Sequence, residues 1–240
     1  MQDSLYVALS SQVALERRLA TIADNVANAG TIGFRATGIR FEDLVSGSGD
    51  KEVSFASAGE TYLSTKVGAL RETGNPFDFA VQGDAWFAIE TPAGMVMTRD
   101  GRFTMRDDGM LVTIEGYTVL DAGGAPIQLD PQNGRPEAGA DGALRQGGNA
   151  VGAIGLYSYD PGVSFVRFGN SGVVPAQPPE AVVDRNDVGV AQGFLEESNV
   201  NPVLEMSRLI MVQRAFENVA ASMRASEQTL GDAIAALGPK

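Results

Sequence analysis

Two acidic pairs come nearest to an arrangement for chemistry in this chain of 240 residues. Asp107-Asp108-Gly109 suggests a calcium loop, but the alternating acidic ligands and the closing Glu of such a loop are missing. Glu196-Glu197 would offer a glycosidase two carboxylates, yet adjacent carboxylates on a strand point in opposite directions. The sequence therefore favours a simple hairpin turn at Asp108-Gly109 and predicts no catalytic carboxylate pair.

The remaining residue types exclude most other chemistry. The chain has no His and no Cys, which rules out Ser-His-Asp and Cys-His triads, thiol catalysis and Cys-based zinc sites. Its glycines do not form a phosphate-binding loop or a dinucleotide fingerprint. Trp86 and Phe87 lie in an apolar strand, which predicts core positions for both. We therefore expect no catalytic, cofactor-binding or metal-binding residues, and a protein that is not an enzyme.

The net charge of −12 is confined to the middle of the chain. Residues 1–35 and 205–240 are each neutral, so the excess acidic charge falls within residues 36–204. An acidic middle repels nucleic acid and anionic membranes, whereas neutral ends can pack side by side. We expect protein partners and no nucleic acid. We also expect no membrane insertion and no cleaved signal peptide, because long apolar runs and a basic start are both missing.

A long helix is predicted at each end of the chain. The first begins at Asp3 or Ser4, either of which can cap its first turn, and ends near Asn28, where Gly30 is expected to close it in the left-handed conformation. The second begins at Asn201-Pro202, a capping residue followed by a first-turn proline, and ends near residue 237.

Apolar residues recur along both predicted helices at spacings of three and four, which keeps one seam toward a partner helix. One interpretation is that each helix packs on the protein's own core, and the other, which two such helices favour, is assembly of helix against helix. The assembly seam of the first helix is Leu5, Leu15, Leu19, Ile22 and Val26. The assembly seam of the second helix is Leu209, Val212, Phe216, Val219, Met223 and Leu230.

The middle of the chain is predicted to be mainly β-structure. Turn signals at Asp100-Gly101, Asp108-Gly109, Glu115-Gly116 and Gly123-Gly124 leave room for short strands in a meander of hairpins. A loop or extended linker is expected at residues 46–60, an exposed loop at 135–152, and strands at 154–159 and 165–168. The fold class is thus α+β, divided into an N-terminal helix (1–35), a connector (36–80), a β-rich outer domain (81–192) and a C-terminal helix (193–240).

Three ordered stretches resemble one family, the bacterial flagellar basal-body rod and hook proteins. They are LATIADNVANAGTIGFR (19–35), GALRETGNPFDFAVQGDAWFAI (68–89) and ESNVNPVLEMSRLIMVQRAFE (197–217). Within the family the chain is most similar to the F-type proximal rod branch, with the distal rod branch as the alternative. Asp24 and Ala85-Trp86 depart from the common pattern, which has Asn and Gly-Phe there. The family motif positions are Asn25, Asn28, Gly33, Phe34, Gly74, Asn75, Pro76, Asn199, Asn201, Gln213 and Arg214.

The resemblance implies a structural subunit of the periplasmic rod of the flagellum. Its terminal helices would pair as a coiled-coil-like inner layer with the β domain outside, and its partners would be other rod proteins and further copies of itself. It would leave the cell through the flagellar type III export apparatus with its N-terminus uncleaved, and its helices would be largely disordered until assembly. A different class of protein remains an alternative: a soluble β-domain binding module that forms dimers through its helical ends.

Overall fold

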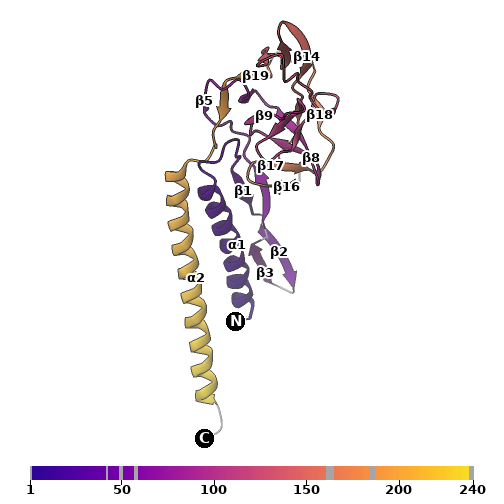
Figure 1. Cartoon of the computed structure of the whole chain (residues 1–240). Helices are drawn as coiled ribbons and strands as arrows, with labels where there is room; N and C mark the ends of the chain where they lie inside the picture. Colours follow the sequence, from indigo (N-terminus) through magenta and orange to yellow (C-terminus); the bar gives the residue numbers. More distant parts are fainter. Residues whose placement is uncertain are drawn as a thin grey trace. The chain divides into compact units, whose positions relative to one another are not determined.

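A computed structural model describes residues 2–41, 43–48, 51–56, 59–160, 165–183 and 187–237 (Figure 1). The chain forms two compact units. The arm unit comprises Met1–Ala27, Thr37–Thr61 and Asn201–Lys240, and the β unit comprises Asn28–Ala36 and Tyr62–Val200. The fold is α+β, with a helix at each end and mainly antiparallel sheets, as the sequence predicts.

The arm unit is built on two long helices, α1 (Gln2–Ala27) and α2 (Pro202–Leu237). Both helices end within a residue or two of the predicted bounds. The predicted cap of α2 is confirmed, because the Asn201 side-chain oxygen accepts a hydrogen bond from the Leu204 N–H at 3.1 Å. Among the described residues, neither helix combines the length and the apolar run that a membrane crossing requires.

Short strands follow α1 in the arm unit: β1 (Thr37–Arg40), β2 (Asp43–Ser48) and β3 (Lys51–Ala56), with the unit boundary falling inside β4 (Glu60–Leu63). The expected linker at residues 46–60 is therefore wrong in part, because β2 and β3 form an antiparallel hairpin. The serines and glycines there do not prevent pairing, since backbone hydrogen bonds between neighbouring strands need no particular side chain. In the arm unit α1 also contacts β1 and β3.

The end of α1 differs from the prediction in one detail. Gly30 does not adopt a left-handed conformation, whereas Gly33 does, with a φ of 68°. The chain turns instead through Asn28, whose carbonyl accepts a hydrogen bond from the Thr31 N–H at 3.1 Å and whose side chain binds the Thr31 hydroxyl at 3.1 Å. A local Asn-Thr turn thus supplies the reversal that the sequence assigns to a helix-closing glycine.

The β unit is centred on a nine-stranded antiparallel sheet with the order β16-β17-β8-β7-β11-β10-β9, from which β15 pairs with β7 and β18. The strands are β7 (Trp86–Thr91), β8 (Gly94–Thr98), β9 (Phe103–Met105), β10 (Leu111–Thr113), β11 (Thr118–Val119), β15 (Leu156–Ser158), β16 (Phe165–Phe168), β17 (Gly172–Pro175) and β18 (Glu180–Ala181). The strands predicted at 154–159 and 165–168 are confirmed.

Smaller sheets complete the β unit. β5 (Leu70–Glu72) pairs with β20 (Phe194–Glu196), and β6 (Phe79–Gln82) pairs with β19 (Gly189–Gln192). In the main core the ring of Phe103 packs against two others, with its centroid 5.9 Å from that of Phe79 and 5.2 Å from that of Phe87. Trp86 and Phe87 are 2% and 0% exposed, which confirms the predicted core positions.

The predicted meander holds for three of its four turns, because Leu120 also bridges Pro126 across the turn at Gly123-Gly124, where Gly124 has a φ of 79°. β9, β10 and β11 follow one another as hairpins, with Gly109 and Gly116 at φ values of 87° and 89° in the turns. Asp100-Gly101 is different, because β8 pairs with β7 and β17 rather than with β9. At that position the Asp100 carboxylate accepts hydrogen bonds from the Arg102 guanidinium, the shortest at 2.5 Å.

The loop expected at residues 135–152 is wrong. This segment forms a three-stranded sheet of β12 (Glu137–Ala138), β13 (Ala143–Gln146) and β14 (Asn149–Ala153). Four of its five glycines lie in the turns between strands, where Gly142, Gly147 and Gly148 have positive φ, whereas Gly152 lies in β14. The strands themselves are short, and Leu144, which is 0% exposed, anchors them in the core. Strands of two to five residues therefore form despite the high glycine and alanine content.

Candidate assembly surfaces

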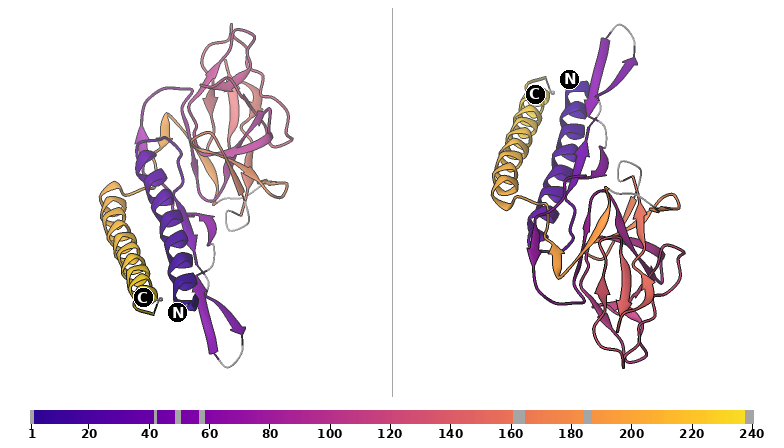
Figure 2. Two further views of the ribbon diagram at one scale, coloured as in Figure 1. Left: turned by 90° about the horizontal axis from the view of Figure 1, so that it is seen from below. Right: turned by 90° about the horizontal axis from the view of Figure 1, so that it is seen from above.

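The two helices of the arm unit lie side by side and run in opposite directions (Figures 1 and 2). Ile22 of α1 and Val212 of α2 are each only 5% exposed. The other described seam residues are half-buried: Leu15, Leu19, Val26, Leu209, Phe216, Val219 and Met223. The side chains of Leu5 and Leu230 lie outside the described residues. Every described seam side chain is thus at least partly covered, in contrast to most of the remaining helix surface.

A second set of apolar residues on the same helices lies outside the predicted seam, and these residues are exposed. On α1 they are Tyr6, Leu9 and Val13, and on α2 they are Val203, Leu204, Met206, Ile210 and Met211. The signal was present in the sequence: residues 203–212 are apolar at seven of ten positions, so no single face of this stretch can bury them all. A helix with apolar residues on most sides is suited to contacts on more than one side.

Asn25 holds the end of α1 to β1 within the arm unit. Its side-chain amide donates to the Thr37 carbonyl at 2.9 Å and its side-chain oxygen accepts from the Thr37 N–H at 2.9 Å. The residue is 4% exposed, so both bonds are shielded from water. Asn25 thus pairs with the backbone N–H and carbonyl of Thr37 in the same way that a residue of a neighbouring strand would.

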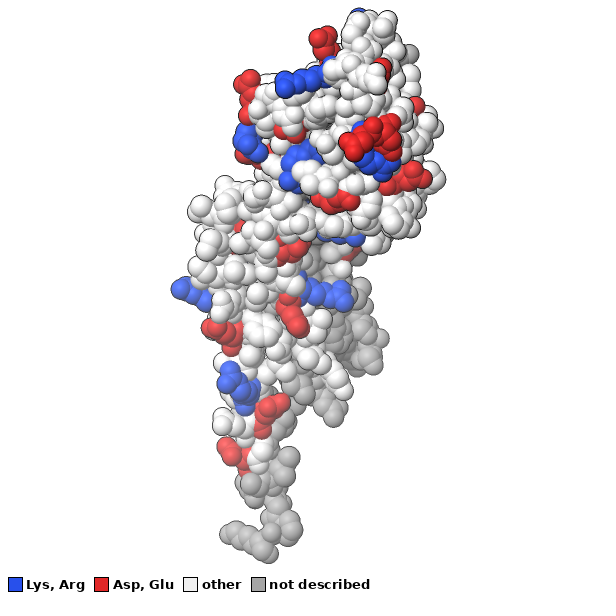
Figure 3. Space-filling view, in the orientation of Figure 1, with Lys and Arg blue, Asp and Glu red and all other residues white. Residues whose placement is uncertain are grey.

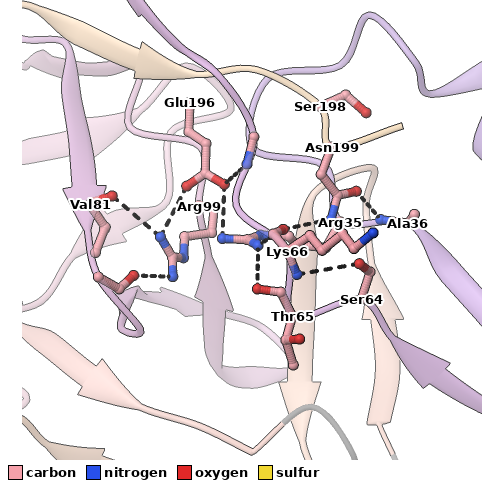
Figure 4. Close-up of polar contacts among 12 residues, drawn as sticks. Arg35, Ala36, Ser64, Thr65, Lys66, Val81, Arg99, Glu196, Ser198 and Asn199 are labelled. Atoms are coloured by element: carbon pink, nitrogen blue, oxygen red, sulfur yellow. Dashed lines mark hydrogen bonds and ion pairs between the residues drawn. The ribbon is translucent and has the colours of Figure 1, made fainter. Parts of the chain in front are cut away.

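The β unit contains a buried charge cluster that the sequence did not predict (Figure 4). Glu196 at the end of β20 accepts a hydrogen bond from the Gly68 N–H at 2.9 Å and lies between two guanidinium groups. Arg35 Nη2 is 2.8 Å from one carboxylate oxygen, and Arg99 Nη1 is 3.0 Å from the other. All three side chains are at most 3% exposed. Adjacent Glu197 is exposed and pairs with Arg71, so the two carboxylates do point in opposite directions.

Backbone carbonyls and an aromatic ring complete the surroundings of the two arginines. Arg99 donates to the Gly83 carbonyl at 2.8 Å, and Arg35 donates to the carbonyls of Thr65 and Lys66. Both guanidinium groups lie near the Trp86 ring, at 5.7 Å for Arg35 and 5.3 Å for Arg99 from its centroid. Burial lowers the pKa of Arg35 to about 10, against the opposing effect of Glu196. Burial likewise lowers the pKa of Arg99, so the carboxylate partly offsets the cost of burying two cations.

Asn199 and Glu196 hold the residues after α1 beside those before α2, all within the β unit. The Asn199 side chain accepts from the Ala36 N–H at 2.7 Å and donates to the Lys66 carbonyl at 2.7 Å. The Asn199 N–H donates to the Phe34 carbonyl at 3.2 Å, and the Gly33 N–H donates to the Glu196 carbonyl at 2.7 Å. Two segments far apart in the sequence are therefore bound together as one structural piece.

Comparisons with known proteins match three parts of the chain to the same family of flagellar proteins. The family "Flagella basal body rod protein" matches residues 5–35, the family "Flagellar hook protein FlgE/F/G D1 domain" matches 80–145, and "Flagellar basal body rod FlgEFG protein C-terminal" matches 191–236. A protein of Mesorhizobium japonicum named flagellar basal-body rod protein FlgF is 72% identical over 240 residues, which cover 100% of both chains. The chain belongs to the flagellar basal-body rod protein family.

Two further relatives show where the chain stands within the rod protein family. FlgF of Rhizobium meliloti is 58% identical and covers 99% of each chain. FlgG of Bacillus subtilis is 28% identical and covers 98% of each chain. Similarity to FlgF proteins is thus much higher than similarity to this FlgG protein, which agrees with the F-type branch indicated by the sequence motifs.

The rod family motif positions fall into two groups in the structure. Asn25 and Asn201 shape the arm unit, and Gln213 and Arg214 lie exposed on α2. Gly33, Phe34 and Asn199 lie around the buried charge cluster of the β unit, where Phe34 is 1% exposed and packs beneath the Arg167 guanidinium at 4.3 Å. Gly33 is required there, because a Cβ atom would lie 2.3 Å from the Asp100 backbone nitrogen.

The motif Gly74-Asn75-Pro76 forms a bend into β6. Gly74 has a φ of 68°, and the Asn75 carbonyl accepts from the Asp78 N–H at 3.1 Å. The Asn75 side chain donates to the Asp78 carboxylate at 3.0 Å, and the Pro76 carbonyl accepts from Gln192 at 2.7 Å. These hydrogen bonds fix the conformation of the bend in the β unit.

One hollow on the described surface of this rod family member is small for a ligand site. A hollow of about 190 Å³ is lined by Ser158–Asp160 and Gln177–Glu180, smaller than the roughly 300–1,000 Å³ of typical ligand pockets. Asp108 of the acidic pair instead forms an ion pair with Arg106. In the described part of the chain, no three acidic side chains come together as metal ligands would.

Proposed function

We propose that the protein is a structural subunit of the proximal rod of the bacterial flagellar basal body, and not an enzyme. The observation that carries this proposal is full-length similarity, at 72% identity, to a FlgF basal-body rod protein. The two long helices of the arm unit supply the means of assembly. The lower identity to FlgG of Bacillus subtilis, 28%, makes the distal rod the weaker alternative.

The helix pairing is the finer part of the proposal. Residues of the seam, including Ile22 and Val212, would pack α1 on α2 as a coiled-coil-like arm. Support comes from the 3-4 spacing of the seam and from the partial or complete burial of every described seam side chain. The division into an N-terminal helix (1–35), connector (36–80), outer β domain (81–192) and C-terminal helix (193–240) belongs to this proposal as well.

Partners and location follow from the same proposal. Other rod proteins and further copies of this chain would surround the two helices, and residues 1–35 and 205–240, which contain most of both helices, each carry no net charge. The chain would reach the periplasm through the flagellar type III export apparatus with its N-terminus intact. Formation of the arm would be coupled to assembly, because a helix with an uncovered apolar stripe gains most of its stability from packing.

Quantitative mass spectrometry of purified hook–basal bodies tests the proposal. Cells that lack the gene and carry a plasmid copy of the intact chain are expected to be motile, with the chain recovered at a few copies per particle. A chain without residues 2–27 is expected to be absent from the particles while its β unit stays soluble. Many copies per particle would indicate the distal rod. Absence of the intact chain from the particles would refute the rod function and favour a soluble binding module.

A further inference from the structure

The chain enters and leaves the β unit through two segments that lie far apart in the sequence. Residues 28–36 follow α1 and belong to the β unit, as do residues 62–200, which precede α2. We call residues 33–36 the entry segment and residues 196–199 the exit segment. A pull applied through α1 and α2 therefore reaches the β unit at these two segments.

The entry and exit segments run side by side in the same direction. The Gly33 N–H donates to the Glu196 carbonyl at 2.7 Å, and the Asn199 N–H donates to the Phe34 carbonyl at 3.2 Å. The Asn199 side-chain oxygen accepts from the Ala36 N–H at 2.7 Å, although these two residues are 163 positions apart. Later residues of one segment thus bind later residues of the other, which is the order of a parallel pair.

A buried ion pair and a third segment, residues 64–68, reinforce this pairing (Figure 4). Arg35 Nη2 lies 2.8 Å from the Glu196 carboxylate, and the two side chains are 3% and 2% exposed. This pair is shielded from water, unlike the charged side chains that Figure 3 shows on the surface. The Asn199 amide also donates to the Lys66 carbonyl at 2.7 Å. Charge-assisted bonds in such a shielded site are stronger than exposed ones.

Force between the two ends of the chain acts on the paired segments in shear. It pulls the entry segment toward its N-terminal end and the exit segment toward its C-terminal end. In a parallel pair these two directions are opposite along one axis, so the bonds between the segments are loaded together and not one after another. The residues between the two segments, including the arm strands within 37–61, lie inside a loop that these bonds close.

We infer that the entry and exit segments form a load-bearing clamp, which protects the rest of the β unit and residues 37–61 from a pull applied through α1 and α2. The clamp adds a mechanical property to the proposed rod function and does not depend on which subunits surround the helices. While the clamp holds, force passes directly from the entry segment to the exit segment. The sheets of the β unit then stay folded even when the two helices are pulled apart.

Pulling the whole chain in optical tweezers tests the clamp. The variant Gln2→Cys with Lys240→Cys attaches DNA handles at the two ends, and the chain suits this because it has no native Cys. Opening of the clamp should release the 163 positions between Ala36 and Asn199 in one event. At roughly 3.5 Å for each extended residue, the gain in length is about 570 Å. Without a clamp, residues 37–61 would extend first, and the main event would be shorter by about 90 Å.

A matched pair of variants separates the clamp from general stability. Asn199→Ala removes the side-chain bonds to Ala36 and Lys66, and the unfolding rate at constant force should rise about tenfold. The control is Gln146→Ala, which also removes side-chain bonds to backbone, but inside the closed loop. It should lower the urea midpoint and yet change the unfolding rate under force by less than about twofold.

Each outcome supports or overturns the clamp. Release of the whole loop in one event, with faster opening in Asn199→Ala only, supports it. Early extension of residues 37–61, or equal acceleration by Gln146→Ala, overturns it. If Asn199→Ala does not fold, the length released by the chain with only its terminal Cys substitutions decides the question. None of these outcomes affects the rod function, which fails only if the intact chain is absent from basal bodies.

Discussion

Replacing the carboxylate of Glu196 by an amide should strongly destabilise the β unit. Glu196→Gln keeps the size of the side chain, and its amide oxygen can still accept the Gly68 N–H. The change removes the single negative charge between the Arg35 and Arg99 guanidinium groups, which are 3% and 1% exposed. Removing one partner of a buried ion pair typically costs about 3–5 kcal/mol, because the other charge stays buried without compensation.

The size of this effect can be compared with the total stability of a domain. A loss of about 3–5 kcal/mol is a large share of the roughly 5–15 kcal/mol that holds a typical domain folded. For a domain of about 150 residues it lowers the melting temperature by roughly 10 °C. The double variant Arg35→Met with Glu196→Gln also removes one of the two buried cations that Glu196→Gln leaves without a carboxylate. It should therefore recover part of the lost stability.

Urea denaturation followed by tryptophan fluorescence measures the effect directly. The chain has a single Trp, and Trp86 lies within 6 Å of both guanidinium groups. The matched control is Glu197→Gln, the same chemical change at the neighbouring residue. Its carboxylate is exposed and pairs with Arg71 at 3.1 Å, so the expected loss is at most about 1 kcal/mol. Equal unfolding midpoints and slopes for the two variants would refute the argument that the buried cluster stabilises the β unit.

Three further sets of substitutions test other parts of the structure. Gly33→Ala should lower the stability of the β unit by about 1–3 kcal/mol, because the new Cβ would lie 2.3 Å from backbone at a residue with positive φ. Gly30→Ala is the control, and because open space surrounds Gly30 it should change the urea midpoint little. Tyr159→Phe should be neutral or stabilising, since the described residues offer its buried hydroxyl no hydrogen bond, but Tyr157→Phe should lose about 1 kcal/mol with its bond to a backbone carbonyl. Burial raises the pKa of both tyrosines in the folded chain above the usual 10.0, so the unfolded state ionises first and stability falls as the pH rises through 10. If stability fell as steeply with pH in Tyr159→Phe as in the unaltered chain, the raised pKa of Tyr159 would be contradicted. Asn25→Ala removes both side-chain hydrogen bonds to the Thr37 backbone, and circular dichroism melting should show the helical signal lost at lower temperature. An unchanged melt would contradict the role of Asn25 in the arm.

The terminal helices were predictable from the sequence because their signals are local. Asn201-Pro202 marks the start of α2 through capping and a fixed φ, and the 3-4 spacing marks the face that is covered. The Gly74-Asn75-Pro76 bend and the core positions of Trp86 and Phe87 rest on equally local chemistry. The family motifs lie in these same segments, which is why the family could be identified without the structure.

The charge cluster and the strand pairing were decided only by the tertiary structure. Arg99 and Glu196 are 97 positions apart, and nothing in their neighbouring residues indicates that they meet. The sheet at residues 135–152 forms because Leu144 reaches the core and most of the glycines fall in turns, which composition alone does not show. Local sequence sets backbone preference and amphipathic faces, but which distant segments share a buried charge or a backbone ladder depends on how the whole chain packs.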